Sequence, residues 1–333
     1  MTTLIRTELA TGLTVSAQGF GGMALTDVYG GLDQEQALKT LHHAVDTGVT
    51  FIDTADVYGA GSNEELVGRL LQGRRDEVEV ATKFGIEGSP ASGYTGVRGD
   101  AAYVQSAAEA SLRRLGTDVI DLYYMHRRDT SVPIEETVNA MAVLVAAGKV
   151  RHLGLSEVTA DELSAAHAVH PIAAVQSEWS IWSRDVERQV VPAAVRLGVG
   201  FVPYSPLGRG FLTGTVQARS LSAGDFRHRV PRFSADAMDA NAAVVEAVQA
   251  VAVNAGATPA QVALAWLGAQ GSKFGLPVVP IPGTRKPERI DENAGALSVT
   301  LSDADLDVLD AAADLVVGER SANPGWVSKG REA

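Results

Sequence analysis

The 333-residue sequence contains no cysteine, which excludes disulfide bonds and thiolate metal sites. It also lacks an apolar run long enough to span a bilayer, and its first residues, MTTLIRTELATGLTV, do not resemble a signal peptide. Basic residues are the minority: 28 Lys and Arg stand against 40 Asp and Glu, a net charge of −12. That balance argues against binding to nucleic acid phosphates. We therefore expect a cytoplasmic protein that acts on a small molecule, without nucleic acid or membrane partners.

The sequence does contain a regular alternation of short apolar runs with longer, alanine-rich amphipathic segments. The apolar runs predict strands at 16–20, 49–53, 77–82, 119–124, 150–155, 173–177, 199–203 and 277–281. The amphipathic segments predict helices at 34–47, 63–72, 101–115, 134–147, 160–168, 184–197, 240–254 and 287–294. Such alternation is typical of βαβ units and a parallel sheet. Eight units favour an α/β fold of the (β/α)8 TIM barrel type over an open sheet.

Three segments lie outside this alternation. Residues 1–15 predict an N-terminal hairpin that turns at ATG, and residues 208–239 predict a long loop after strand seven. Residues 302–313 predict an extra C-terminal helix, followed by an irregular tail at 314–333. No linker divides the chain, so we expect a single barrel domain over residues 1–333.

The segment GFGGMA at 19–24 fits the dinucleotide fingerprint G-x-G-x-x-A, which would indicate a Rossmann domain. Its context disfavours that interpretation. The residues LTDVYGG separate it from the next predicted helix, and Asp53 follows after about 30 residues instead of about 20. We interpret the glycines as a loop whose backbone lies close to a ligand at the barrel mouth, with Gly22 and Met23 in contact with it.

Polar side chains end three consecutive predicted strands. Asp53 ends the second strand and Tyr58 follows it, Lys83 ends the third, and His126 ends the fourth. A barrel brings these C-terminal ends side by side, so Lys83 is the cation expected to balance a buried Asp53. Taken singly, an Asp–Lys pair or a strand-end His is more often structural. Four such groups at neighbouring strand ends indicate an active site.

This set of four resembles the catalytic tetrad of the aldo-keto reductase superfamily. The surrounding segments resemble its bacterial and plant members: GVTFIDTADVYG, VATKFG, DLYYMH, GLSE, VQSEWS, VPYSPLGRGFLTG and VPIPGTRKPERIDEN. Some of those relatives reduce pyridoxal or other small aldehydes and ketones, and others are potassium-channel β-subunits. The resemblance implies a reductase of small-molecule carbonyl compounds that uses NADPH.

The resemblance also implies a role for each of the four residues. Tyr58 would donate a proton to the developing alkoxide, and the Lys83 ammonium would lower the pKa of Tyr58. Asp53 would keep Lys83 charged and oriented. A neutral His126 would donate a hydrogen bond to the substrate carbonyl.

Further positions match family contacts to the cofactor, from the nicotinamide to the adenine. The nicotinamide carboxamide would contact Ser156, Glu157 and Gln176, and its ring would stack on Tyr204. The pyrophosphate would lie along Ser205, Leu207, Arg209 and Gly210, where glycines let backbone amides approach. The adenosine 2′-phosphate would contact Gly283, Thr284, Arg285 and Arg289, and the adenine Glu292 and Asn293.

Two other functions are weighed against the reductase. A nicotinamide-binding redox sensor or channel-associated regulatory subunit would keep the same tetrad. A barrel hydrolase or isomerase would leave the phosphate-type loops at 205–214 and 283–293 unexplained. His42 and His43 have no third ligand at metal spacing, so no metal is expected. The sequence does not identify the carbonyl substrate, the preferred direction, the oligomeric state or the role of the 208–239 loop.

Overall fold

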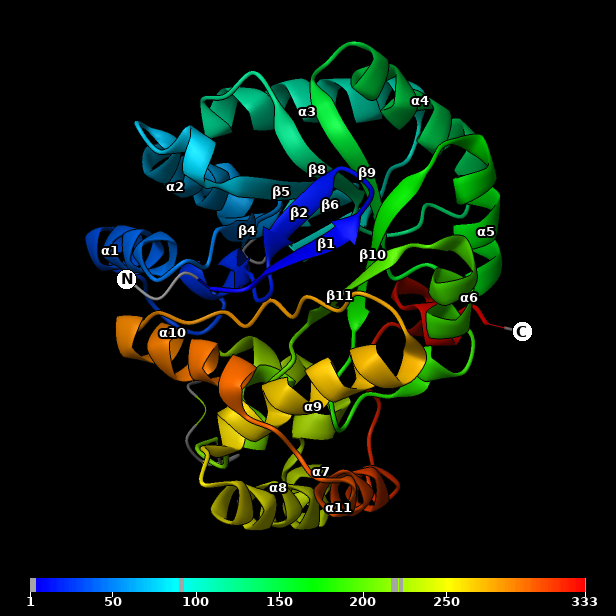
Figure 1. Ribbon diagram of the computed structural model, residues 1–333. Helices are drawn as coiled ribbons and strands as arrows, with labels where there is room; N and C mark the ends of the chain where they lie inside the picture. Colours follow the sequence, from blue (N-terminus) through cyan, green and yellow to red (C-terminus); the bar gives the residue numbers. More distant parts are fainter. Residues whose placement is uncertain (1–3, 90–92, 217–220, 222–223, 333) are drawn as a thin grey trace.

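The computed structural model describes residues 4–89, 93–216, 221 and 224–332. Its centre is a barrel of parallel strands surrounded by helices (Figure 1), which confirms the predicted fold class. Seven strands pair in the order β11-β10-β9-β8-β5-β4-β3. In chain order they are β3 (Phe20–Gly21), β4 (Phe51–Asp53), β5 (Glu79–Phe84), β8 (Ile120–Met125), β9 (Val150–Ser156), β10 (Ile172–Glu178) and β11 (Gly200–Tyr204).

The eighth predicted strand, 277–281, closes the barrel without forming a regular ladder. On one side, the N–H of Phe201 donates to the Pro277 carbonyl and the N–H of Val279 donates to the Phe201 carbonyl, each at 2.9 Å. On the other side, the N–H of Gly19 donates to the Pro280 carbonyl at 2.9 Å. Residues 277–282 have the sequence PVVPIP, and the prolines have no N–H to donate. This segment therefore cannot pair along its whole length, but its hydrogen bonds to both neighbours close the barrel.

The helices surround this barrel and bury their apolar faces in the main hydrophobic core, in which α8 packs against α9 and α11. They are α1 (Gln34–Asp46), α2 (Ser62–Leu71), α3 (Ala101–Leu115), α4 (Ile134–Ala146), α5 (Ala160–Val169), α6 (Val190–Leu197), α7 (Ala235–Ala240), α8 (Ala242–Ala255), α9 (Pro259–Phe274), α10 (Pro287–Ala294) and α11 (Asp303–Ala313). Within the described residues no single helix is long and apolar enough to cross a membrane. The bent pair 235–255 and 259–274 meets the criterion only when joined across an 89° bend.

The first predicted strand, 16–20, is wrong in its position. Residues Leu13–Ser16 form β2, which pairs with β1 (Arg6–Ala10) in the N-terminal hairpin, and the barrel strand is only Phe20–Gly21. Ser16 explains the break. Its hydroxyl accepts hydrogen bonds from the backbone N–H groups of Thr50 and Phe51, both at 3.1 Å. The side chain thus occupies donors at the start of β4 that a continuing strand would have used.

Other boundaries also differ from the prediction. The helix predicted at 184–197 begins only at Val190, after a 3-10 turn at 185–187. Helix α9 and the hairpin of β6 (Ile86–Ser89) and β7 (Gly93–Val97) were not predicted. The predicted loop at 208–239 contains short helices, and its residues 217–220 and 222–223 lie outside the described residues, as do 1–3 and 333 at the termini. A Thr258 capping box with Pro259 after it marks the start of α9.

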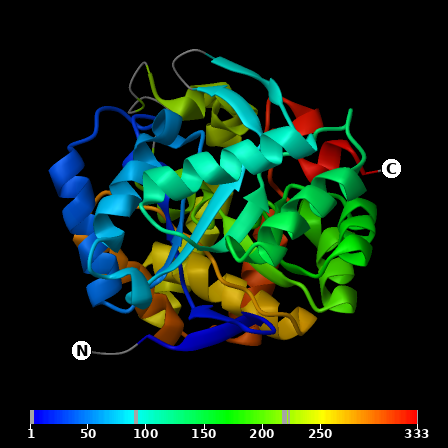
Figure 2. The same ribbon diagram turned by 90° about the horizontal axis from the view of Figure 1, so that it is seen from above.

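The two ends of the barrel are covered differently. Figure 2 shows the β1–β2 hairpin across one end and the β6–β7 hairpin at the opposite end. The first hairpin buries Leu9, Leu13 and Val15 against the side chains that fill the barrel. This cover closes the N-terminal end of the strands, and their C-terminal ends open toward the second hairpin.

The contact between the β1–β2 hairpin and β11 gives the first prediction. A Cβ at Gly200 would lie 2.3 Å from the Leu9 carbonyl oxygen, so Gly200→Ala must displace the hairpin. We expect the free energy of unfolding to fall by about 1–3 kcal/mol. Gly268, inside α9, is the matched control because a Cβ there meets nothing within 4 Å.

Gly268→Ala should raise the free energy of unfolding by about 0.5–1 kcal/mol, because alanine restricts the unfolded chain and favours the helix. Urea unfolding of both variants measures the difference. Equal shifts of the two midpoints would show that the hairpin adapts to the added methyl group.

Candidate active site

The four predicted catalytic residues lie together at the C-terminal ends of the strands. Asp53 and Lys83 are buried charged residues of β4 and β5, and His126 directly follows β8. The Lys83 ammonium contacts the Asp53 carboxylate and donates to the Thr54 carbonyl at 2.7 Å. Burial raises the pKa of Asp53 and lowers the pKa of Lys83, and the contact between the two charges opposes both shifts.

Tyr58 lies in a tight turn (Tyr58–Gly61) between β4 and α2, above the Lys83–Asp53 pair. The Lys83 nitrogen is 5.1 Å from the centre of the Tyr58 ring. The Tyr58 and His126 rings pack edge to face, with their centroids 5.8 Å apart. The tetrad is therefore one contact group.

The pKa values of His126 and Tyr58 are shifted in opposite directions. Burial, Arg127 and Lys83 all lower the pKa of His126, which leaves a neutral imidazole at pH 7. Burial and the Asp53 charge raise the pKa of Tyr58, whereas Arg127 and Arg209 act to lower it. Tyr58 is therefore a protonated hydroxyl in this structure. Arg127 is a nearby cation that the sequence analysis did not include.

Helix α2 holds the backbone around the tetrad. The amide of Asn63 donates to the carbonyls of Gly22 and Leu25 at 3.0 and 2.9 Å, and accepts from the Thr54 hydroxyl at 2.7 Å. The buried carboxylate of Glu64 accepts from the Thr82 hydroxyl at 2.5 Å. Because Thr54 follows Asp53 and Thr82 precedes Lys83, the first turn of α2 fixes both strand ends.

The tetrad opens into a cleft of about 760 Å³ that continues to the start of α10. The predicted site residues that line it are Met23, Asp53, Tyr58, His126, Gln176, Tyr204, Ser205, Leu207, Arg209, Gly210, Gly283, Thr284, Arg285, Arg289 and Asn293. Its lining includes eight cationic side chains: Arg127, Arg209, Arg227, Arg229, Arg285, Lys286, Arg289 and Arg320. Among the described lining residues, Asp53 is the one carboxylate. In a protein of net charge −12, this enrichment favours an anionic ligand.

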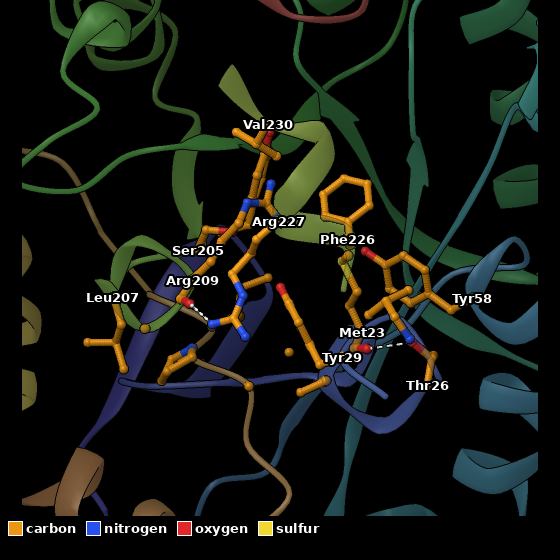
Figure 3. A pocket seen from close by; sticks show the side chains of 18 of the residues that line it. Met23, Thr26, Tyr29, Tyr58, Ser205, Leu207, Arg209, Phe226, Arg227 and Val230 are labelled. Atoms are coloured by element: carbon orange, nitrogen blue, oxygen red, sulfur yellow. Dashed lines mark hydrogen bonds between the residues drawn. The ribbon is translucent and has the colours of Figure 1, made fainter. Parts of the chain in front are cut away.

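Two loops meet over the middle of this cleft (Figure 3). The N–H of Phe226 donates to the Val28 carbonyl at 3.0 Å, and the Arg227 guanidinium lies over the Tyr29 ring at 5.2 Å. Arg227 also donates to the backbone carbonyl of Arg209 at 3.1 Å. The loop after β11 and the loop after β3 thus enclose the part of the cleft between the tetrad and α10.

The far end of the cleft has the features of a phosphate and base site. Lys286 has no carboxylate partner among the described residues, and Arg289 is paired only weakly, with Glu292 at 3.7 Å. The side-chain oxygen of Asn293 is buried in the lining without a hydrogen-bond partner. Beside them the backbones of Gly283 and Gly21 lie in close contact, because a Cβ at Gly283 would lie 2.4 Å from the Gly21 carbonyl oxygen. These groups fit an elongated anionic ligand with a polar base.

Five predicted site residues do not line the cleft: Gly22, Lys83, Ser156, Glu157 and Glu292. Lys83 lies against the Tyr58 ring, and the carboxylate of Glu157 accepts hydrogen bonds from Tyr204 and Arg320. Arg285 does line the cleft, but its guanidinium already donates to four carbonyls of the loop after β3, those of Ala24, Thr26, Gly30 and Gly31. In this structure Arg285 therefore anchors that loop.

Sequence reasoning also missed several lining residues. Arg127 follows His126 directly, and its position beside a strand-end histidine was a usable signal. Lys286 precedes a proline that begins α10, which also could have marked it. Tyr29 and Trp326 carried no such signal, because only the fold brings their loop and tail to the cleft.

Comparisons with known proteins agree with this geometry. A model of the Aldo/keto reductase family matches residues 18–314. Probable aldo-keto reductase 1 from Glycine max is 48% identical over 299 residues, which covers 89% of this chain and 84% of that protein. The solved glycerol dehydrogenase from Gluconobacter oxydans is 27% identical with a TM-score of 0.82, over 94% of this chain and 95% of that one.

A second solved relative is an aldo/keto reductase from Klebsiella pneumoniae in complex with NADP and acetate. It is 28% identical with a TM-score of 0.70, and covers 93% of this chain and 95% of that one. The matched family model spans most of this sequence, including every residue of the tetrad. The chain belongs to the aldo/keto reductase family.

Proposed function

We propose that this protein reduces small aldehydes or ketones to alcohols with NADPH. The observation that carries the proposal is a single cleft that joins a buried Lys83–Asp53 pair and Tyr58 to a cation-rich end at α10. The solved relative with NADP supports the same cofactor for this chain. The relatives reported above are named as reductases or a dehydrogenase, which favours an enzyme over a regulatory subunit.

NADPH, when bound, supplies the hydride to the carbonyl carbon. Tyr58 then delivers its hydroxyl proton to the carbonyl oxygen, so that the alcohol forms and a phenolate remains. The nearby cations Lys83, Arg127 and Arg209 stabilise that phenolate until it is reprotonated. The neutral imidazole of His126 orients the carbonyl by a hydrogen bond.

The residues that would hold the cofactor lie along the cleft. Gln176 donates to Asp53 at 2.8 Å, and its remaining amide oxygen can accept from a carboxamide. Tyr204 presents a ring at the end of β11. Lys286 and Arg289 line the cleft and would contact the 2′-phosphate, and the unpaired side-chain oxygen of Asn293 would accept from the adenine amino group.

Cofactor preference tests the cation-rich end of the cleft. Arg289→Ala should remove a charge-assisted contact worth roughly 1.5–3 kcal/mol, so NADPH binding should weaken at least tenfold while NADH binding changes little. Arg285→Ala is the control, because loss of its four carbonyl contacts should weaken both cofactors alike. Binding titrations of the two variants with both cofactors give the answer. Equal losses for Arg289→Ala would show that this arginine does not contact the 2′-phosphate.

Metal removal tests the proposed polarisation of the carbonyl by side chains. Among the described residues no group of three or more His, Asp or Glu side chains could hold a metal ion, and the chain has no Cys. We expect the rate of carbonyl reduction to be unchanged after exhaustive chelation. Loss of activity that one divalent ion restores would contradict a mechanism based on Tyr58 and His126.

The proton donor is tested by two substitutions. Tyr58→Phe should lower kcat by about 10²–10⁴-fold, because the general acid is lost, with the affinity for NADPH nearly unchanged. Lys83→Met should leave the hydroxyl in place but destabilise its phenolate. Alcohol oxidation needs that phenolate, so its pH profile should move to higher pH.

Arg127→Met is the matched comparison for Lys83→Met, because Arg127 acts to lower the pKa of Tyr58. It should move the oxidation profile in the same direction while the Lys83–Asp53 pair stays intact. A Tyr58→Phe enzyme with near-normal turnover would require another acid. If the pH profile of alcohol oxidation were unshifted in both Lys83→Met and Arg127→Met, the two cations would have only a structural role.

A further inference from the structure

The carboxylate of Glu157 is the centre of a buried network at the end of β9. It accepts five hydrogen bonds: from Arg320 Nη1 at 2.8 Å and Nη2 at 3.0 Å, from the Tyr204 hydroxyl at 2.7 Å, and from the backbone N–H groups of Glu178 at 3.1 Å and Ser328 at 3.0 Å. An ionised carboxylate offers about four lone-pair sites. Glu157 therefore has no free acceptor for a nicotinamide carboxamide.

Arg320 connects this carboxylate to the C-terminal tail. Its guanidinium lies between Glu157 and Asp185, and it donates to Asp185 through Nε at 3.1 Å and Nη2 at 2.8 Å. Both Glu157 and Arg320 are buried. Burial acts to raise the pKa of Glu157, but Arg320, together with Arg127 and the Ser328 N–H, outweighs it and holds that pKa at about 2. The pair is thus charged at any ordinary pH.

The groups held by Glu157 form two walls of the cleft. Tyr204 ends β11 and lines the cleft near the tetrad. The tail contributes Asn323, Trp326 and Val327 to the lining, and the Trp326 ring lies 5.7 Å from the Tyr94 ring of the β6–β7 hairpin. One carboxylate therefore sets the position of both the tyrosine and the tail.

We infer that Glu157 is a positioning residue that fixes the Tyr204 ring for the nicotinamide and anchors the tail over the carbonyl substrate. The part that concerns ligands rests on the proposed function, whereas the anchoring of the tail does not. The rival assignment is the family contact predicted from sequence, in which Glu157 accepts a hydrogen bond from the carboxamide itself. The two assignments differ in what a Glu157 variant does to the tail and to cofactor analogues.

Hydrogen exchange measured without cofactor tests the anchoring. In Glu157→Gln an amide group faces the donors of Arg320 and Ser328, so exchange of the Ser328 N–H and of residues 319–328 should accelerate at least tenfold. Arg320→Lys keeps the positive charge but loses the two-pronged guanidinium contact, and it should act in the same way if Glu157→Gln fails to fold. Lys329→Ala is the control, because it removes only the exposed tail pair with Glu319. Unchanged exchange at Ser328 in both network variants would overturn the anchoring.

Cofactor binding tests the link to Tyr204. We expect Glu157→Gln and Tyr204→Phe each to weaken NADP+ binding roughly threefold to tenfold, and the double variant to bind no more weakly than Glu157→Gln alone. The 3-acetylpyridine analogue of NADP+ lacks the carboxamide N–H. The ratio of its Kd to that of NADP+ should be equal in wild type and Glu157→Gln.

If this ratio of Kd values moved toward one in Glu157→Gln, it would establish direct contact of Glu157 with the carboxamide and overturn the inference. Additive losses in the double variant would overturn the link to Tyr204. The KM for a carbonyl substrate should rise in Arg320→Lys and stay unchanged in Lys329→Ala. Failure of the wild type to bind NADP+ or its analogue would instead refute the proposed function, and the exchange experiment would still decide the anchoring.

Discussion

The buried contact between Lys83 and Asp53 is the constraint on which the rest of the site depends. Removing two such charges from water costs several kcal/mol for each ion, and the attraction offsets that cost only when further hydrogen bonds complete the pair. Here those bonds come from Thr54 and from Gln176 on β10. The pair therefore requires β4, β5 and β10 to end at one level around a closed barrel, and this closure places Tyr58 and His126 beside it.

The cleft is electropositive in an acidic protein because only some of its lining cations are paired with carboxylates. Several lining cations are already paired: Arg209 with Glu178 at 3.6 Å, Arg227 with Asp225 at 2.6 Å, and Arg320 with Glu157. These pairs hold loops in place and contribute little net charge. Arg127, Arg229, Arg285 and Lys286 have no carboxylate in ion-pair range among the described residues, so the attraction for an anion comes from them, with a weakly paired Arg289.

The sequence predicted what depends on short-range pattern. Alternating strands and helices, and polar residues at strand ends, are local features, so the barrel and the grouping of the tetrad could be inferred. Contacts between distant segments could not. Glu157 meets Arg320 across 163 positions, and the anchoring of the loop after β3 by Arg285 has no periodic signature. The error at 16–20 has the same origin, because the Ser16 hydroxyl bonds to residues 34 and 35 positions away.

The backbone conformation of the cleft loops follows from those distant contacts. Glu157, Ser205 and Arg209 adopt positive φ angles of 55°, 50° and 53°, a region that costs a residue with a side chain roughly 1–2 kcal/mol. Such a conformation persists only where the surroundings hold it. Five donors hold Glu157, and Glu178 together with the Tyr29 hydroxyl holds Arg209. The conformation of the loops beside Tyr204 is therefore stabilised by contacts within the protein, from the C-terminal tail, from Glu178 at the end of β10 and from the loop after β3.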